Sequence, residues 1–361
     1  MKKILTVGSA MLDLFLSLGK DTLPCIEKKE SRQSFMLLEV GRKLELPTIH
    51  RCSGGGATNA AVSLSRQGFE VSAFFKAGVD CESEFIKRQL AQDNIDTHNC
   101  VSSKNAPTGI SLIFPCSDGD RTTLTYRGAS ITLSEQELPL SLLKNLDCLY
   151  ITSLTGATAP LLLPLVKAAH KQNIFIASNP GSSQLRAGAY ELQLALPYID
   201  VLILNSDEAV ECMKSFIATG ISLKEPKYVP GPALVSMPFI REDITFNLRQ
   251  YCAEVLSRGP KMVVITNGKE GVYVAHGTTL LFHPSLPAEV VNTLGAGDAF
   301  GSGFVGALLH HKSIEEALLQ GLVQASAVIS VLDAQSGLLS ADKLKERSAK
   351  VSTNQLQHFK I

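Results

Sequence analysis

The sequence predicts a three-layer α/β fold, in which a mostly parallel central sheet lies between two layers of helices and a small β-sheet forms a lid. Strand-like and helical runs alternate along most of the chain. The strand-like runs are almost continuously apolar, which is typical of strands buried on both faces. With 361 residues, 45% hydrophobic and 19% charged, the chain can bury a large core, and we expect one domain spanning residues 1–361.

The alternation sets the order of the expected elements. Apolar runs without helical spacing predict strands, and runs with apolar residues three and four apart predict helices. The first helix should end before Gly68, a residue type common just past helix ends. We expect strands at residues 4–7, 71–75, 148–152, 174–178, 201–204, 262–266 and 271–275, and helices at 57–67, 82–93, 161–172, 207–216, 299–310 and 314–332, with a surface helix and tail from residue 343.

Two segments have the alternating pattern of a half-exposed sheet. Residues 112–115 and 122–126 flank a polar turn and indicate a β-hairpin, and residues 35–51 mix polar and apolar positions. We expect parts of residues 14–50 and 105–128 to form the lid. Such a lid has exposed strand edges, through which two copies of the chain could pair as a homodimer.

Composition and charge exclude several classes of protein. The formal net charge is zero, so no nucleic-acid partner is expected. No apolar stretch is long enough to cross a bilayer, and Asp13 interrupts the N-terminal apolar run early, so we expect a cytoplasmic protein without a membrane partner. The eight cysteines are scattered without a C-x-x-C pair, which favours free thiols over a zinc cluster.

A glycine-rich motif near residue 295 carries the main chemical signal. Gly295, Ala296 and Gly297 precede an expected helix, and such a turn can aim backbone N–H groups at a phosphate. Asp298 stands at the helix start, where the helix dipole should favour its charged form. A carboxylate there can accept a proton from a hydroxyl while the N–H groups stabilise a phosphoryl group in transfer.

A glycine-rich turn before a helix also occurs without this chemistry. The turn could be a tight strand-to-helix connection in which Asp298 is merely the N-cap. A dinucleotide fingerprint requires a strand after the helix, whereas a second helix is expected here at residues 314–332. A P-loop is absent, because neither Gly19-Lys20 nor Gly268-Lys269 has the flanking residues that it needs.

A second motif, Gly54-Gly55-Gly56-Ala57-Thr58-Asn59, precedes the first expected helix. Its glycines allow a ligand to approach the backbone closely, and the amide of Asn59 offers both a donor and an acceptor to a polyol. The alternative is a glycine turn that packs tightly on a sheet.

These two motifs, in this order and far apart, resemble those of the pfkB family of ribokinase-like sugar kinases. Members of that family show an early G-G-x-x-x-N stretch and a late D-T-x-G-A-G-D stretch, and the resemblance extends over essentially the whole chain. It implies ATP-dependent phosphorylation of a hydroxyl on a small sugar or sugar-like acceptor, assisted by Mg²⁺. A nucleoside acceptor and a catalytically inactive sensor of nucleotide or sugar remain as alternatives.

The resemblance also implies roles for individual residues. Asn179-Pro180 matches the family's N-P turn. The resemblance implies a catalytic base at Asp298 and an anion hole at the backbone of Gly295, Ala296 and Gly297. It implies that Asp13, at the end of the first strand, contacts the acceptor together with Gly55, Gly56 and Asn59. ATP contacts are implied for Asn205, Glu208, Thr266 and Gly268, and Glu208 should also hold Mg²⁺ through water.

The chain departs from the family pattern at three places. Asn292 replaces the usual Asp of the late motif, so a K⁺ site at Asn292 and Thr293 would have an oxygen ligand without its charge. Gly56 stands where ribokinase itself usually has Lys. Residues 220–241 form a Pro- and Gly-rich insertion.

Arg127, at the end of the hairpin, could bind a carboxylate or phosphate of the acceptor, or could simply be solvated.

Overall fold

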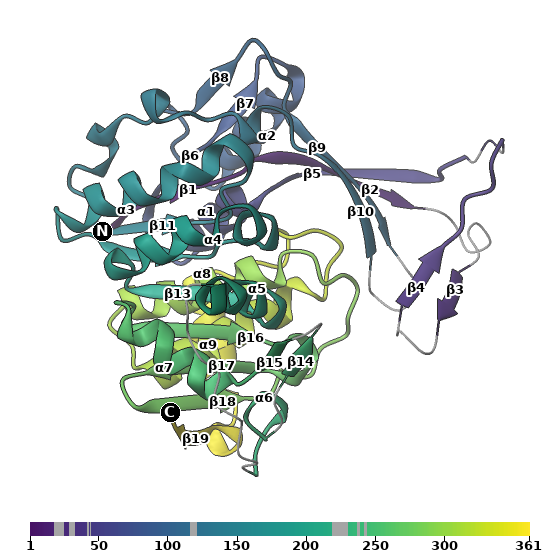
Figure 1. Cartoon of the computed structure of the whole chain (residues 1–361). Coiled ribbons are helices and arrows are strands. Elements are labelled where there is room, and N and C mark those ends of the chain that lie inside the picture. The colour runs from purple at the N-terminus through teal and green to yellow at the C-terminus, as the bar shows by residue number, and fades with distance from the viewer. Residues whose placement is uncertain are drawn as a thin grey trace.

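The main sheet of the protein is nine strands wide and mostly parallel. The computed structural model describes residues 1–17, 25–28, 33–41, 43, 45–115, 121–218, 230–236, 239–241 and 244–361 (Figure 1). Neighbouring strands run parallel from β6 to β16 and antiparallel beyond it. The order is β19 (Gln357–Lys360), β18 (Thr279–His283), β17 (Val272–His276), β16 (Met262–Thr266), β13 (Val201–Asn205), β12 (Phe175–Ser178), β11 (Cys148–Ile151), β1 (Lys3–Val7) and β6 (Glu70–Phe74).

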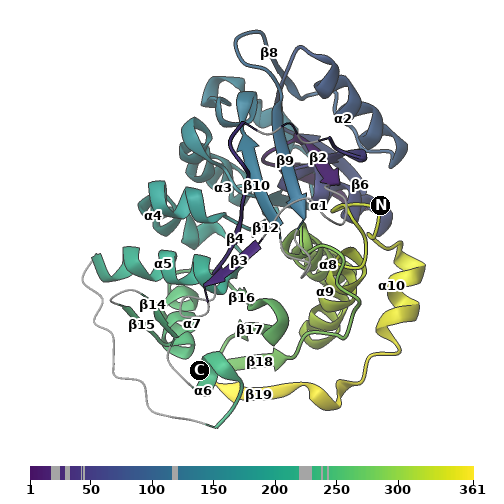
Figure 2. The same ribbon diagram turned by 90° about the vertical axis from the view of Figure 1, so that its right-hand side faces the viewer.

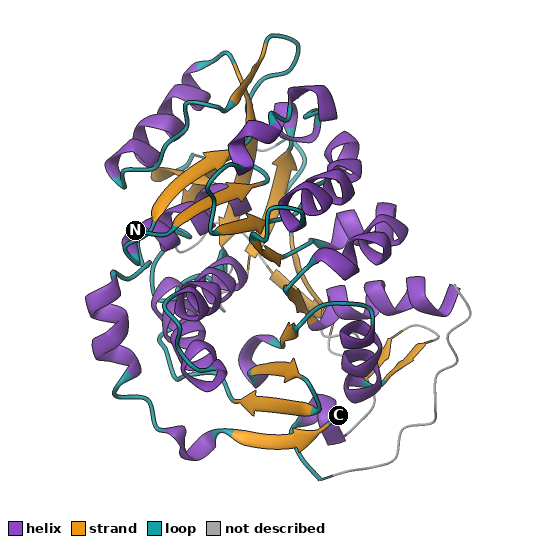
Figure 3. Ribbon diagram, turned by 90° about the vertical axis from the view of Figure 1, so that its left-hand side faces the viewer, coloured by secondary structure: helices purple, strands orange, loops and turns teal. Residues whose placement is uncertain are grey.

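Helices cover both faces of this sheet, which confirms the predicted three-layer class (Figure 3). In β1 the side chains of Leu5 and Val7 join one buried cluster and that of Ile4 joins the other, as expected when successive side chains alternate between faces. One layer contains α3 (Leu162–His170), α4 (Ser182–Ala195), α5 (Ser206–Ala218) and α7 (Leu248–Ser257), and the other α1 (Gly56–Arg66), α2 (Cys81–Gln92), α8 (Ala296–Leu309) and α9 (Ile314–Val328), with α10 (Ala341–Ser348) against α9.

Every strand and helix expected for the main layers is present, within a few residues at each end. The elements α4, α7, β18 and β19 were not predicted, and the tail after residue 343 was expected to be a surface segment. The tail instead pairs with β18 through β19, a polar strand whose side chains are mostly exposed. Backbone pairing and the packing of Phe359 against the core hold this strand, and one apolar residue in a polar run gives no strand pattern.

A separate four-stranded sheet lies beside the main body (Figures 1 and 2). Its order is β10 (Arg121–Tyr126), β9 (Gly109–Pro115), β2 (Met11–Ser17) and β5 (Thr48–Gly54). The β9–β10 pairing confirms the predicted hairpin, although its turn lies outside the described residues. Of the segment 35–51, only its last residues join this sheet, because β4 (Gln33–Met36) pairs with β3 (Cys25–Lys28) instead.

The expected insertion at residues 220–241 falls largely outside the part of the chain that the structure describes. Its described portion contains α6 (Ala233–Ser236) and β14 (Phe239–Arg241), which pairs with β15 (Ile244–Phe246). A short parallel pair joins β7 (Lys76–Gly78) to β8 (Val101–Ser103). Among the described helices, none combines the length and apolar character that crossing a bilayer requires.

Candidate active site

A cavity of about 280 Å³ opens where the parallel strands of the main sheet end. Thr152 and Asn179 directly follow β11 and β12, and Asn205 and Thr266 are the last residues of β13 and β16. The carboxyl ends of neighbouring parallel strands are the usual place for ligands in open α/β sheets. Residues of both sequence motifs line this cavity, together with predicted ATP-contact residues: Gly56 of the early motif, Thr293, Gly295, Gly297 and Asp298 of the late motif, and Asn205, Glu208 and Thr266.

The first turn of α8 forms one wall of the cavity. Gly295 is the N-cap, with φ of 77°, and a Cβ there would lie 2.4 Å from Cβ of Ala334. A Cβ on Gly297 would meet nothing within 4 Å. Backbone N–H groups in the first turn of a helix have no partner within the helix. The empty space beside Gly297 therefore fits a phosphate better than it fits the tight packing of a structural turn.

Asp298 is not the N-cap of α8, because Gly295 takes that position and no side chain caps the helix. Asp298 lies in the first turn, where its Oδ2 accepts a 2.8 Å hydrogen bond from Nδ2 of Asn59. Burial raises the pKa of Asp298 and the bond from Asn59 lowers it, with a net rise. The helix start was expected to favour the charged form, whereas burial makes the net change in the pKa of Asp298 a rise.

The resemblance implied that Asp13 lies at the end of the first strand, but it lies within the second strand, β2. Its carboxylate is buried, and desolvation raises its pKa to about 6. A hydrogen bond from Ser111 and the charge of Arg121 act in the opposite direction, and the charge of Asp298 adds to the rise. A Cβ on Gly54 would lie 1.9 Å from Oδ2 of Asp13, so glycine at this position makes room for the carboxylate.

Close contacts with neighbouring residues also explain why Gly55 and Gly56, the other two glycines of the early motif, have no side chain. Gly55 has φ of 98°, and a Cβ there would lie 2.5 Å from the carbonyl oxygen of Ser9. A Cβ on Gly56 would lie 2.7 Å from Cβ of Thr152. These glycines let the start of α1 approach β1 and β11 closely, and Gly56 and Thr152 both line the cavity.

Asn205 and Glu208 form a reciprocal cap at the start of α5. Oδ1 of Asn205 accepts a 2.8 Å bond from the N–H of Glu208, and Oε2 of Glu208 accepts a 2.9 Å bond from the N–H of Asn205. Oε1 of Glu208 lies 3.5 Å from Oγ of Ser182, and burial raises the pKa of the carboxyl despite these bonds. One carboxylate oxygen thus serves the cap, and the residue still lines the cavity, where an oxygen ligand suits Mg²⁺.

Among the residues that the structure describes, the arginine that lines the cavity is Arg121 and not Arg127. Arg121, at the start of β10, lines the cavity and donates from Nη1 to Oγ1 of Thr293. Arg127 follows the other end of this strand and is not among the lining residues, and neither is Gly268. No motif distinguished the two arginines, because the way the small sheet docks decides which end of β10 meets the cavity.

Two further sets of residues had no signal in the sequence. Thr152 and Ser153 line the cavity after β11. Gln335, in the loop after α9, donates from Nε2 to Oδ1 of Asn59 at 3.0 Å and accepts from Oγ of Ser53 at 2.8 Å. Gln335 therefore orients the amide whose other end holds Asp298.

The contacts of Asn292 and Thr293 do not favour a monovalent cation. Nδ2 of Asn292 donates to the carbonyl of Leu332 at 2.7 Å, and its Oδ1 accepts from the N–H of Leu294 at 3.0 Å. Oγ1 of Thr293 accepts from Arg121. Both ends of the Asn292 amide are therefore already engaged by backbone groups.

The comparisons with known proteins give the class of the chain. A model of the pfkB family carbohydrate kinases matches residues 1–341, and the chain belongs to this family. It is 24% identical over 341 residues to a bifunctional ribokinase/ribose-5-phosphate isomerase A from Fructilactobacillus sanfranciscensis, covering 94% of this chain and 54% of the relative. It therefore spans about half the length of that relative.

Two more comparisons agree with this class. The chain is 24% identical over 321 residues to a 2-dehydro-3-deoxygluconokinase from Bacillus subtilis, covering 87% of this chain and 92% of the relative. The structure of Arabidopsis thaliana ribokinase complexed with ribose and ATP superposes with a TM-score of 0.72 at 20% identity, covering 97% of this chain and 99% of that one. This likeness shows the ribokinase fold.

Proposed function

We propose that the protein transfers the γ-phosphoryl group of ATP to a hydroxyl of a small sugar or sugar-like acceptor, with Asp298 as the base. One observation carries this proposal: Asp298 lies in the first turn of α8, beside the open space at Gly297, and is held by Asn59 of the other motif. A structural cap would explain none of these three features.

In the proposed reaction the acceptor oxygen attacks the γ-phosphorus while its proton moves to a carboxylate oxygen of Asp298. The bond between the γ-phosphorus and the bridging oxygen breaks, and ADP leaves with that electron pair. Backbone N–H groups of Gly295 and Gly297 stabilise the charge on the transferring group, and that of Ala296 joins them by giving up its 3.3 Å bond to the carbonyl of Thr293. Mg²⁺, when bound, would offset phosphate charge, and Glu208 is the residue placed to hold it through water.

ATP would lie along the carboxyl ends of β13 and β16, near Asn205 and Thr266, and the acceptor beneath the small sheet. Asp13 and Asn59 would offer oxygen and amide groups to sugar hydroxyls, and the backbone of Gly55 would contact the acceptor beside them. The small sheet would act as a lid that excludes water and limits ATP hydrolysis.

Arg121 favours an acceptor or transition state with negative charge near the cavity. A sugar acid or sugar phosphate fits this charge, and the name of the Bacillus subtilis relative refers to a sugar acid. A nucleoside acceptor is the second candidate, because a cavity lined by Ser, Thr and Asn side chains can also bind a ribose.

The protein is further proposed to work in the cytoplasm and to pair through the lid with a second copy of itself. Ile49, Leu124 and Tyr126 of the small sheet are each more than half exposed, which is costly for apolar side chains on a free monomer. Sedimentation of the full chain would test this pairing, and a monomer at micromolar concentration would contradict it.

The test of the activity is ADP release from ATP and Mg²⁺ across a panel of sugars, sugar acids, sugar phosphates and nucleosides. Asp298→Asn should lower acceptor-dependent turnover by about 10²- to 10⁴-fold, because it removes the base while keeping an oxygen for Asn59. Asp342→Asn, on the exposed first turn of α10, is the matched control. Turnover of Asp298→Asn at the wild-type rate would refute the mechanism, and binding of ATP without turnover on any acceptor would favour an inactive sensor.

A further inference from the structure

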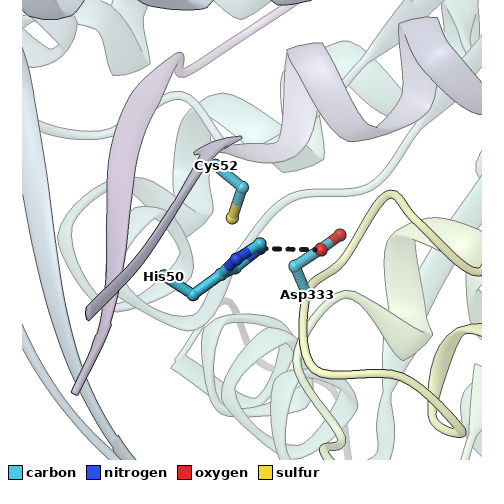
Figure 4. A group of neighbouring side chains, drawn as sticks. All are labelled: His50, Cys52 and Asp333. Atoms are coloured by element: carbon cyan, nitrogen blue, oxygen red, sulfur yellow. Dashed lines mark hydrogen bonds and ion pairs between the residues drawn. The ribbon is translucent and has the colours of Figure 1, made fainter. Parts of the chain in front are cut away.

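Three side chains of metal-binding type meet between the small sheet and the main body (Figure 4). His50 and Cys52 are two positions apart on β5 and project from one face of the strand. Asp333 comes from the loop between α9 and α10. One ligand atom from each residue lies within 4.8 Å of the others, so the group is compact although Asp333 is far from the other two in the sequence.

The spacing of these atoms fits a small tetrahedral ion. Nε2 of His50 lies 3.2 Å from Oδ2 of Asp333. Two ligands bonded at about 2.0 to 2.1 Å to a tetrahedral zinc ion are about 3.3 Å apart. The nitrogen and oxygen, which form a hydrogen bond, are thus already at about the required separation. Each distance from Sγ of Cys52 to these two atoms is at most 4.8 Å and would have to shorten by up to about 1.2 Å.

Neighbouring groups hold the carboxylate in place. Asp333 is buried, and its Oδ1 accepts from the N–H groups of Gln335 and Ser336 at 2.8 and 2.7 Å. Its Oδ2 accepts from Oγ of Ser336 at 2.6 Å. Hydrogen bonds of this kind orient the ligands of metal sites. His50 is half exposed, so an ion can enter from solvent and a water can complete its coordination.

We propose that His50, Cys52 and Asp333 bind a zinc ion that fastens the small sheet to the loop after α9. A nitrogen, a thiolate and a carboxylate suit zinc, whereas Mg²⁺ and Ca²⁺ prefer oxygen ligands alone. Binding forms a bond between Zn²⁺ and Sγ of Cys52 and releases the thiol proton to solvent. The site is separate from the Mg²⁺ position proposed at Glu208. It also departs from the prediction that the cysteines are only free thiols.

The electrostatic surroundings explain why a cation would stabilise this site. Cys52 and Asp333 are both buried, and Sγ of Cys52 lies 4.0 Å from the carbonyl oxygen of Asp13. A dication between the sulfur and Asp333 offsets both negative charges.

Zinc at this position would affect the neighbouring cavity through the loop. Ala334 packs against Gly295, and Gln335 bonds to Asn59 and Ser53. Joining β5 to this loop through a metal would hold the small sheet against the body. We therefore expect zinc to slow a reaction that requires this sheet to open for product release.

The binding test uses the tag-free full chain in excess Mg²⁺, with Co²⁺ as a spectroscopic probe. A thiolate-to-cobalt charge-transfer absorption should appear at one equivalent and disappear when Zn²⁺ is added. Cys52→Ala should abolish the band, and His50→Gln should weaken Co²⁺ binding at least tenfold. The controls are Cys81→Ser and His98→Gln, two exposed residues outside the group, which should leave the band unchanged.

Absence of the band in the wild type, or an unchanged band in His50→Gln, would overturn the proposal. His50→Gln alters a half-exposed side chain and should fold even where Cys52→Ala, whose sulfur packs against Phe15 and Ile113, does not.

The effect on the lid has its own test. Zn²⁺ should raise the melting temperature of the wild type and not that of His50→Gln. It should also slow acceptor-dependent ADP release in the wild type by at least twofold, with relief in His50→Gln. Equal inhibition of both proteins would refute the fastening role. The thermal and cobalt measurements do not depend on turnover, so they remain decisive even if the proposed kinase reaction is wrong.

Discussion

The amide of Asn59 donates a 2.8 Å hydrogen bond to the carboxylate of Asp298, 239 positions later in the chain. This bond joins the two motifs that the sequence shows only as separate stretches. Gln335 holds the other end of the same amide. The proposed base is therefore oriented by a short chain of side chains that begins in the loop after α9.

Asn59→Ala should lower kcat by about tenfold to a hundredfold, because a hydrogen bond to a charged group contributes about 1.5–3 kcal/mol. The bond lowers the pKa of Asp298, so its loss should raise that pKa and move the acid limb of the kcat profile to higher pH. Kinetics across the pH range measure both effects, with exposed Asn354→Ala as the control. An unmoved acid limb would argue against Asn59 acting on Asp298.

Asp13→Asn should stabilise the fold at pH 8 while weakening acceptor binding. The pKa of Asp13 rises from 3.8 to about 6 on folding, so its contribution to stability is present below pH 3.8 and lost as the pH rises through about 6. At 1.36 kcal/mol per pKa unit, the ionised group costs the folded state at most about 3 kcal/mol at pH 8. We expect the variant to gain about 1–3 kcal/mol there.

Urea unfolding in chelator-containing buffer at pH 8 and pH 4 measures this gain. The difference between variant and wild type should shrink at the lower pH, where Asp13 of the wild type is protonated. A variant less stable than the wild type at pH 8 would show that the carboxylate is a net stabiliser of the fold.

Gly297→Ala should impair the use of ATP without destabilising the fold. A Cβ at Gly297 meets no atom within 4 Å, and alanine favours a helix over glycine, so stability should be unchanged or rise by up to about 1 kcal/mol. The methyl group would enter the space proposed for phosphate, so kcat/KM for ATP should fall at least tenfold. Gly303→Ala is the contrasting variant, since its Cβ would crowd Cβ of Gln324 at 3.0 Å and should lower the melting temperature.

Arg121→Met and Arg127→Met should differ, although both arginines flank the same strand. Arg121 lines the cavity, and losing its charge should lower kcat/KM by about tenfold to a hundredfold, as expected for a charge-assisted hydrogen bond. Arg127→Met should stay within about twofold of the wild type on every acceptor. The reverse order of effects would favour Arg127 as the arginine that binds the acceptor.

The wild type should work equally well in KCl and in choline chloride, because the amide of Asn292 already bonds to the carbonyl of Leu332. Asn292→Asp would place a carboxylate oxygen against that carbonyl, costing about 1–3 kcal/mol unless a cation bridges them. Its melting temperature should therefore rise in K⁺ relative to choline at equal ionic strength. A K⁺-dependent wild type would contradict this account of Asn292.

Local patterns in the sequence were sufficient for much of the fold and for part of the site. Apolar runs and helical spacing gave the layers, because burial on both sheet faces leaves a continuous apolar signature. Gly295, Gly297, the pair Asn205 and Glu208, and Thr266 were all predicted as site residues, and all line one cavity. The strand β19 was not predicted because it is a mostly polar segment, in which Phe359 is the apolar residue that packs against the core.

The class of fold and the kind of chemistry follow from the order of residues alone, since hydrophobic periodicity and glycine turns are properties of neighbouring residues. Three-dimensional packing was needed to establish which arginine reaches the cavity, that burial raises the pKa of Asp298 and Asp13, and that His50 and Cys52 meet Asp333. Desolvation and ligand geometry depend on distances between residues that lie far apart in the chain, and those distances are fixed when the two sheets and the C-terminal loop pack together.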